Sequence, residues 1–169
     1  MAGRHAPGVR RLTGWPVAIG LLALGVALWT TPIAHADNKR LNDGVVANVY
    51  TIQHQAGCTN DLRIDPHLQL AAEWHTNDVL QNRALNGDIG SDGSTPDDRT
   101  VAAGFRGDVA ETVAINAALA ISGVELINQW YHNPDYLAIM RDCKYTAIGV
   151  WSENSLDRTV VVAVYGSPA

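Results

Sequence analysis

Carboxylates gather in one loop of the sequence and raise the question of a cation site. They are Asp88, Asp92, Asp97 and Asp98. An EF-hand calcium loop needs an oxygen ligand at its third position and a glutamate at its twelfth, whereas a loop counted from Asp88 has Gly90 and Arg99 there. The EF-hand interpretation therefore fails. A looser cation site stays open beside the commoner interpretation, a solvated acidic loop.

A single carboxylate, Glu111, interrupts an apolar strand pattern. Residues 109–116 alternate, and Glu111 shares a face with Val109, Val113 and Ile115. An inward carboxylate must be paired, hydrogen-bonded or raised in pKa, and such groups are frequent in functional clefts. Glu111 is therefore the first candidate site residue.

Other chemistry-bearing residues give weaker signals. His75 lies on the apolar stripe of a predicted helix, where it is either a satisfied core or boundary histidine or a cleft residue. The sequence has no Gly-x-Ser-x-Gly and no Ser-x-x-Lys motif, so nucleophile motifs do not indicate an enzyme.

The first 36 residues have the order of a secretory signal. A basic stretch ends at Arg11, an apolar run covers residues 15–29, and the small-residue site Ala34-His35-Ala36 follows. We expect cleavage before Asp37 and a secreted, extracellular or cell-envelope protein. An uncleaved membrane anchor is the alternative, but the Ala-x-Ala site opposes it, so we expect no stable membrane span after cleavage.

The two cysteines, Cys58 and Cys143, have 84 residues between them. In an exported chain such a pair favours one long-range disulfide over a redox or metal site. Two buried free thiols are the alternative. A zinc site is disfavoured because no pair of histidines lies near the cysteines.

The residues after position 36 are predicted to form one domain of helices and strands. We expect helices over 41–56, 66–82, from Pro96, from Ser122 and over 135–140, and strands over 109–116, 145–151 and 158–165, with a polar turn at 152–157. Asp65 and Thr95 are the expected N-caps before Pro66 and Pro96, and Ser122 with Glu125 is an expected capping box. This order predicts an α+β fold with a small antiparallel sheet.

The charge of this domain excludes one class of partner. Residues 1–36 hold three arginines and no acid, which leaves 9 basic against 17 acidic side chains, a net charge of −8. Because nucleic-acid binding needs a basic face, we expect no nucleic-acid partner.

The order of motifs resembles the bacterial branch of the CAP superfamily, the cysteine-rich secretory, antigen 5 and pathogenesis-related proteins that share the SCP domain. The motifs are Asp88-x4-Gly93-Ser94-Thr95-Pro96-x2-Arg99, Gly104-Phe105, Ala110-Glu111, Trp130-x2-Asn133-Pro134 and Ile148-Gly149-Val150, after a helix over 68–78. The resemblance covers residues 41–166. The sequence is similar in particular to short exported actinobacterial members of the superfamily. The resemblance implies an α-β-α sandwich with a cleft.

The resemblance also implies a set of cleft residues, which differs here from the family pattern. Glu111 stands where the family has the glutamate of its Glu-Asn motif, although Thr112 replaces the asparagine. Asp88 and Tyr136 stand where the bacterial pattern has its two histidines, and Asp98 is the candidate for the second acid. The predicted cleft thus joins Asp88, Glu111 and Tyr136 in one pocket, with the Tyr136 hydroxyl donated to a carboxylate.

Loss of both histidines removes the ligands that zinc favours and the groups that pass protons near neutral pH. We therefore expect no metal cofactor, with a Ca²⁺ or Mg²⁺ ion at the cleft carboxylates as a weaker possibility. The function expected is non-catalytic binding of a lipid, an envelope component or a protein. The alternative is a cation-dependent hydrolase that uses Asp88, Asp98 and Glu111.

Overall fold

Five helices and four strands build the domain in the computed structural model, which describes residues 2–3, 33–117 and 119–169. The helices are α1 (Ile33–Gln55), α2 (Pro66–Gln81), α3 (Pro96–Ala103), α4 (Gly123–Tyr131) and α5 (Pro134–Arg141). The strands are β1 (Arg63–Ile64), β2 (Gly107–Asn116), β3 (Ala147–Ser155) and β4 (Arg158–Pro168).

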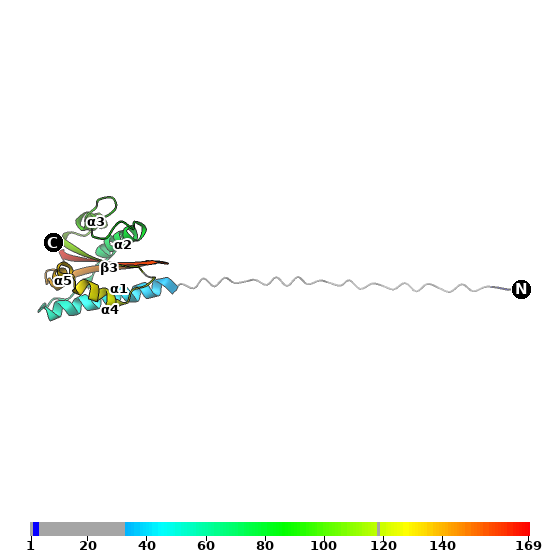
Figure 1. Cartoon of the computed structure of the whole chain (residues 1–169), viewed down its shortest axis with the longest axis horizontal. Coiled ribbons are helices and arrows are strands. Elements are labelled where there is room, and N and C mark those ends of the chain that lie inside the picture. The colour runs from blue at the N-terminus through cyan, green and yellow to red at the C-terminus, as the bar shows by residue number, and fades with distance from the viewer. Residues whose placement is uncertain (1, 4–32, 118) are drawn as a thin grey trace. The chain divides into compact units, whose positions relative to one another are not determined.

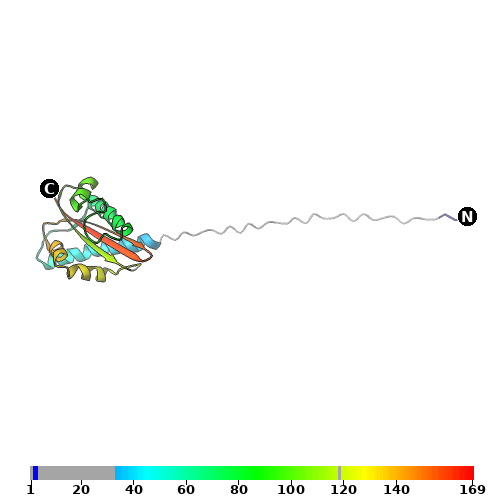
Figure 2. The ribbon, with the colours of Figure 1, turned by 45° about the horizontal axis from the view of Figure 1, so that its top comes forward.

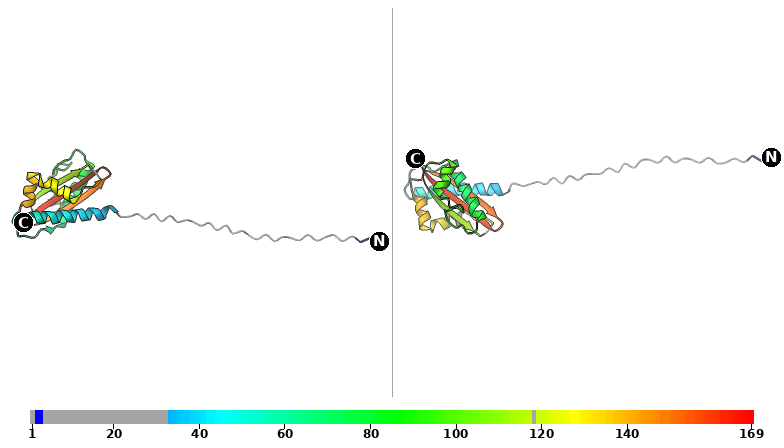
Figure 3. Two further views of the ribbon diagram at one scale, coloured as in Figure 1. Left: turned by 60° about the horizontal axis from the view of Figure 1, so that its bottom comes forward. Right: turned by 90° about the horizontal axis from the view of Figure 1, so that it is seen from above.

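The helices form two layers, one on each face of the sheet. α2 and α3 lie over one face, and α1, α4 and α5 lie over the other (Figure 1). The two views of Figure 3 show the α1, α4 and α5 layer in front of the strands on the left and α2 and α3 in front of them on the right. This arrangement is the α-β-α sandwich that the sequence predicted.

The strands run in the order β1-β3-β4-β2 (Figure 2). β4 pairs antiparallel with both β2 and β3, so the three long strands are antiparallel as expected. β1 adds a parallel pairing of only Arg63 and Ile64 to β3, and this strand was not expected because two residues are too few to show a periodic pattern.

The central strand divides the core between the two layers. Val161, Ala163 and Tyr165 of β4 pack toward α1, α4 and α5, while Val160 and Val162 pack with residues of α2. Successive side chains of a strand point to opposite faces, so continuous burial along β4 serves both layers.

Proline and a preceding capping residue fix most helix starts. Asp65 accepts from the backbone N–H groups of His67 and Leu68, and Thr95 forms a complete capping box with Asp98. Ser122 caps α4 by accepting from the Glu125 N–H. The three caps are confirmed, although at Ser122 the bond accepted from Glu125 is only half of the expected capping box.

Two expected boundaries were wrong by four residues or more. α1 begins at Ile33 rather than at residue 41, and the Asn38 side chain on its first turns donates to the carbonyl of Ser152, a tertiary contact that local periodicity does not reveal. The polar stretch 152–157 is mostly strand, because its residues up to Ser155 pair with β4 and the turn is confined to Leu156 and Asp157.

The predicted disulfide between Cys58 and Cys143 is confirmed. Their Cα atoms lie 5.3 Å apart, and the bond joins the segment after α1 to the segment before β3. It therefore ties one helical layer to the sheet.

The predicted signal peptide, residues 1–36, lies outside the described residues apart from positions 2–3 and 33–36, the latter at the start of α1. Within the described part of the chain, no helix has the length and apolarity needed to cross a membrane.

Candidate functional site

Glu111 is buried between β2 and the α2–α3 layer. Its side chain is fully shielded from solvent, and both carboxylate oxygens lie 3.1 Å from Nη2 of Arg99, whose side chain is 6% exposed. The alternation of β2 directs Glu111 to the face that packs against α2, in agreement with the sequence pattern. The carboxylate is thus held by a guanidinium and is withdrawn from solvent.

Arg99 connects the acidic loop to the sheet. Its Nη1 donates to the carbonyl of Ser94 at 2.8 Å, and its Nη2 donates to the carbonyl of Asp88 at 2.7 Å as well as to Glu111. Charge-assisted bonds of this kind are among the stronger ones in a protein interior. Arg99 therefore holds the loop in place while it donates to Glu111.

His75 of α2 completes this cluster. Its Nε2 lies 2.9 Å from the carbonyl of Gly87 and 3.4 Å from Oε1 of Glu111, and the side chain has no solvent exposure. A carbonyl can only accept, so Nε2 carries the proton and donates to Gly87. Burial lowers the pKa of His75, assisted by the nearby Arg99 charge, and the imidazole is neutral at pH 7.

Burial raises the pKa of Glu111 to about 8, against the opposing effect of the Arg99 charge and hydrogen bond. A carboxyl with such a pKa can hold a proton near neutrality, which is one requirement of an acid or base catalyst. The second requirement is access to a substrate, and the Glu111 side chain is fully buried. The geometry favours a structural carboxyl.

The other predicted acids do not converge on Glu111. Asp98 caps α3: its Oδ2 accepts from the N–H and the hydroxyl of Thr95, at 2.9 and 2.7 Å, and these bonds lower its pKa. Asp88 is exposed and bonds to Arg99 through its main-chain carbonyl, not through its carboxylate.

Tyr136 lies on α5, where it packs with the α1, α4 and α5 layer on the sheet face opposite to Glu111. Burial raises its pKa, with smaller contributions from Asp88 and Glu111, and its hydroxyl has a hydrogen bond to the Val113 backbone. The charges of Asp88 and Glu111 thus act on Tyr136, although Tyr136 packs on the other face of the sheet. Among the described hydrogen bonds, however, the Tyr136 hydroxyl is not donated to a carboxylate.

A solvent-accessible recess of about 510 Å³ lies beside the cluster. We call it the α2–α3 recess; Trp74, His75, Asp78, Asp98 and Arg99 are among the residues that line it. It brings together His75, Arg99 and Asp98 but not Asp88, Glu111 or Tyr136. The sequence missed the cluster of His75, Arg99 and Glu111, although the place of His75 on an apolar stripe was a signal of inward burial.

The histidines and carboxylates of the described residues do not gather into a metal site. Within the described residues, no group of three or more His, Cys, Asp or Glu side chains is placed to hold one. His54 and His132 each bond a carbonyl of their own helix, and His67 lies beside Asp65 at the start of α2.

Comparison with known proteins gives structural neighbours only. No protein-family model and no curated protein matches the chain. An outer surface protein of Borrelia burgdorferi aligns with a TM-score of 0.67 at 18% identity, over 78% of this chain and 95% of that one. An extracellular SCP-domain protein of Bacillus anthracis aligns at 0.59 and 17%, over 81% of this chain and 45% of its own.

A cysteine-rich secretory protein of Staphylococcus aureus aligns with a TM-score of 0.55 at 12% identity, over 77% of this chain. The chain spans less than half the length of the Bacillus and Staphylococcus proteins, at 45% and 39%. These likenesses show that the chain shares the fold of these SCP-domain and cysteine-rich secretory proteins, which is the fold that the resemblance implied.

Proposed function

We propose that this CAP-fold protein is secreted and acts by binding rather than by catalysis. The observation that carries the proposal is the burial of Glu111, with both oxygens on Nη2 of Arg99. The carboxylate that the family places in its cleft here stabilises the fold instead of facing a substrate.

Export is supported by two independent features. Residues 1–36 have the order of a secretory signal, and Cys58 and Cys143 form a disulfide, which persists in oxidising compartments. The extracellular protein of Bacillus anthracis and the outer surface protein of Borrelia burgdorferi are neighbours in fold.

The α2–α3 recess, which contains Asp98 of the candidate cleft residues, is the proposed binding surface. Trp74 is 41% exposed at its wall and offers an apolar contact to a lipid, an envelope component or a protein. Asp78, Asp92 and Asp98 outnumber Arg99 there, so a neutral or cationic group suits the recess better than an anionic one.

A cation-dependent hydrolase is the second candidate, because the raised pKa of Glu111 suits an acid or base. It would require Asp88, Asp98 and Glu111 to act on one substrate. Asp98 is engaged in a helix cap and Asp88 faces solvent, so this arrangement is less well supported.

Native mass spectrometry of the mature protein from its own host tests the binding proposal. We expect a co-purifying mass that is lost in Trp74→Ser and kept in Tyr50→Ser, a control whose aromatic ring is 40% exposed on α1. Hydrolytic turnover that requires Ca²⁺ or Mg²⁺ and disappears in both Asp98→Asn and Glu111→Gln would support the hydrolase instead.

A further inference from the structure

The outer edge of β3 is only partly covered by another strand. β1 pairs with Ala147 and Ile148, whereas β3 continues to Ser155. No strand of the described chain lies beside the outer edge beyond Ile148. An open sheet edge presents unpaired N–H and C=O groups and is a template for another strand.

The direction of the main-chain groups of Val150 follows from the hydrogen bonds of Ile148 and Ser152, two residues before and after it. Asp65 N–H donates to the Ile148 carbonyl at 2.9 Å, and Asn38 Nδ2 donates to the Ser152 carbonyl at 3.1 Å. Since direction alternates along a strand, Val150 also points its N–H and carbonyl outward. No hydrogen bond to these outward groups of Val150 is found in the described chain.

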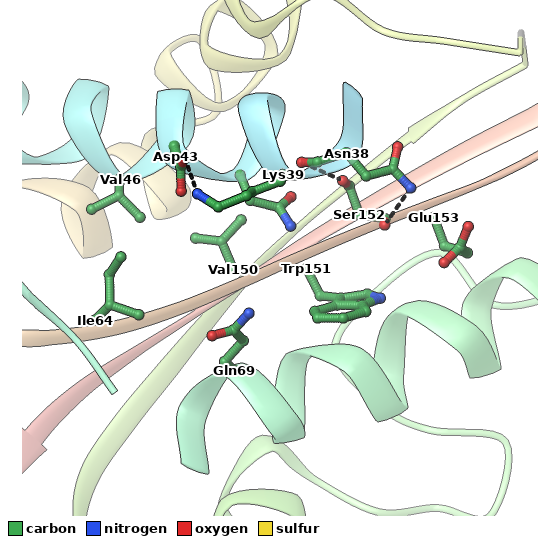
Figure 4. Close-up of a pocket in the computed structure, with 11 residues that line it drawn as sticks. Asn38, Lys39, Asp43, Val46, Ile64, Gln69, Val150, Trp151, Ser152 and Glu153 are labelled. Atoms are coloured by element: carbon green, nitrogen blue, oxygen red, sulfur yellow. Dashed lines mark hydrogen bonds and ion pairs between the residues drawn. The ribbon is translucent and has the colours of Figure 1, made fainter. Parts of the chain in front are cut away.

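A groove of about 370 Å³ runs along this open edge (Figure 4). In Figure 4, Val46 and Asn38 of α1 lie on one side of β3, and Gln69 of α2 and Trp151 lie on the other. We call it the β3-edge groove. A strand laid in it would direct alternate side chains to α1 and to α2.

Two buried polar atoms of the groove residues have no hydrogen-bond partner. They are Oδ1 of Asn42, an acceptor, and Nε1 of Trp151, a donor. Unpaired buried polar atoms are costly, and a native structure retains few of them. A ligand that offers both an N–H and a carbonyl would satisfy the pair.

An amide of this chain already binds the same edge. Asn38 Nδ2 donates to the Ser152 carbonyl, and Asn38 Oδ1 accepts from Asn154 Nδ2 at 2.8 Å. Asn38 Nδ2 thus binds the Ser152 carbonyl as the N–H of an added strand would, one outward position beyond Val150.

The charges of the groove favour one kind of peptide. Lys39 is paired with Asp43 at 2.6 Å, while Glu153 has no cation beside it among the described ion pairs. A basic side chain near Glu153 would complement this carboxylate, and an acidic one would be repelled.

We propose that the β3-edge groove binds an extended, basic peptide segment of a partner protein by strand addition at Val150. The segment extends the sheet where β1 stops, and its amides pair with Val150, Trp151 Nε1 and Asn42 Oδ1. The stretch from Gly149 to Glu153 has five residues, so it takes about five residues of an added strand at ~3.3 Å each. This site is separate from the α2–α3 recess and stands or falls independently of the binding proposed there.

NMR titration of the disulfide-bonded protein tests the site, with a blocked five-residue peptide of alternating valine and lysine as the probe. We expect shifts of the Val150 amide and the Trp151 indole N–H. Methylation of the central peptide nitrogens should weaken binding at least tenfold, because the donors are lost. A valine and glutamate peptide should not bind.

Two charge reversals provide matched variants. Glu153→Lys should weaken binding of the basic peptide about tenfold. Asp108 is exposed on β2, at the other edge of the sheet, and Asp108→Lys should leave the affinity for the peptide unchanged. Equal loss in both variants would show a nonspecific charge effect and overturn the proposal.

Three other results would also overturn it. One is binding that tolerates N-methylation, and another is the same set of shifts produced by a chitin-type oligosaccharide but not by the peptide. The third is concentration-dependent dimerisation that shifts Val150 without peptide, which would make a second copy of the chain the occupant.

Discussion

Nη2 of Arg99 lies 3.1 Å from both carboxylate oxygens of Glu111, and the two buried side chains join α3 to β2. Arg99 also donates to the carbonyls of Asp88 and Ser94. The same guanidinium therefore binds an inward carboxyl and orders the acidic loop. This double role explains how the fold tolerates a carboxyl in its core.

Arg99→Met should be among the most destabilising substitutions in the chain. It leaves Glu111 and two loop carbonyls without their donor, and loss of one partner of a buried pair costs about 3–5 kcal/mol. Urea unfolding at pH 9, above the Glu111 pKa of about 8, measures the loss with the carboxyl ionised. The double variant Arg99→Met, Glu111→Leu should recover part of it, since no carboxyl is then left unpaired. A single-variant loss below about 1 kcal/mol would contradict the structural role of the pair.

The free energy of unfolding should fall as the pH rises from 4.5 to the folded-state pKa of Glu111, about 8. Its pKa is about 8 in the fold against 4.5 when unperturbed, so the folded state binds more protons between these values. The contribution of Glu111 to the free energy of unfolding is therefore fully present below pH 4.5 and is lost as the pH rises through about 8.

His75 acts in the opposite direction at lower pH. Its pKa is lowered below 6.5 in the fold, so the unfolded state binds the extra proton and stability falls as the pH drops below 6.5. Thermal unfolding from pH 5 to 9 separates the two groups. Glu111→Gln should lose the alkaline decline and keep the acid one; an unchanged alkaline decline would assign it to another group.

Helix starts and the disulfide could be predicted because each depends on local chemistry or on compartment. Asp65 before Pro66 and Thr95 before Pro96 are caps that act within one turn. Cys58 and Cys143 needed only an exported chain with no other cysteine. The alternation around Glu111 likewise predicted that it points inward.

Partners across the fold could not be predicted in the same way. His75 and Glu111 are 36 positions apart in the sequence, and their contact depends on how α2 packs on the sheet. Tyr136 occupies a motif position of the family, but α5 places it on the other sheet face. The open edge of β3 depends on β1 ending at Ile64, which no periodic pattern marks.

Removal of the disulfide should destabilise the fold without changing its topology. Cys58→Ser with Cys143→Ser should lower the unfolding free energy by about 2–5 kcal/mol, because the unfolded chain regains the freedom of a long loop. Guanidinium unfolding measures this, and reduction of the unmutated protein should lower the midpoint equally. If reduction leaves the midpoint unchanged, the bond contributes nothing to stability.

Chelation should leave the thermal midpoint unchanged. A structural metal contributes folding free energy directly, and the described residues include no group of three suitable ligands. EDTA against buffer, read by differential scanning calorimetry, checks this. A drop of several degrees that Zn²⁺ alone restores would show that His75 and another histidine meet at a site outside this arrangement.

Gly149 should be intolerant of any side chain. A Cβ at this position would overlap the backbone of Leu68 and Gln69 at the start of α2, and backbone atoms cannot move aside as the end of a side chain can. Gly149→Ala should therefore separate α2 from β3 and cost at least ~3 kcal/mol, comparable to severe overpacking. Gly44→Ala, inside α1 with nothing within 4 Å of the new Cβ, is the matched control and should stabilise the protein by about 0.5–1 kcal/mol. Urea unfolding of both variants measures the contrast, and equal effects would mean that α2 does not pack against β3 as closely as Gly149 allows.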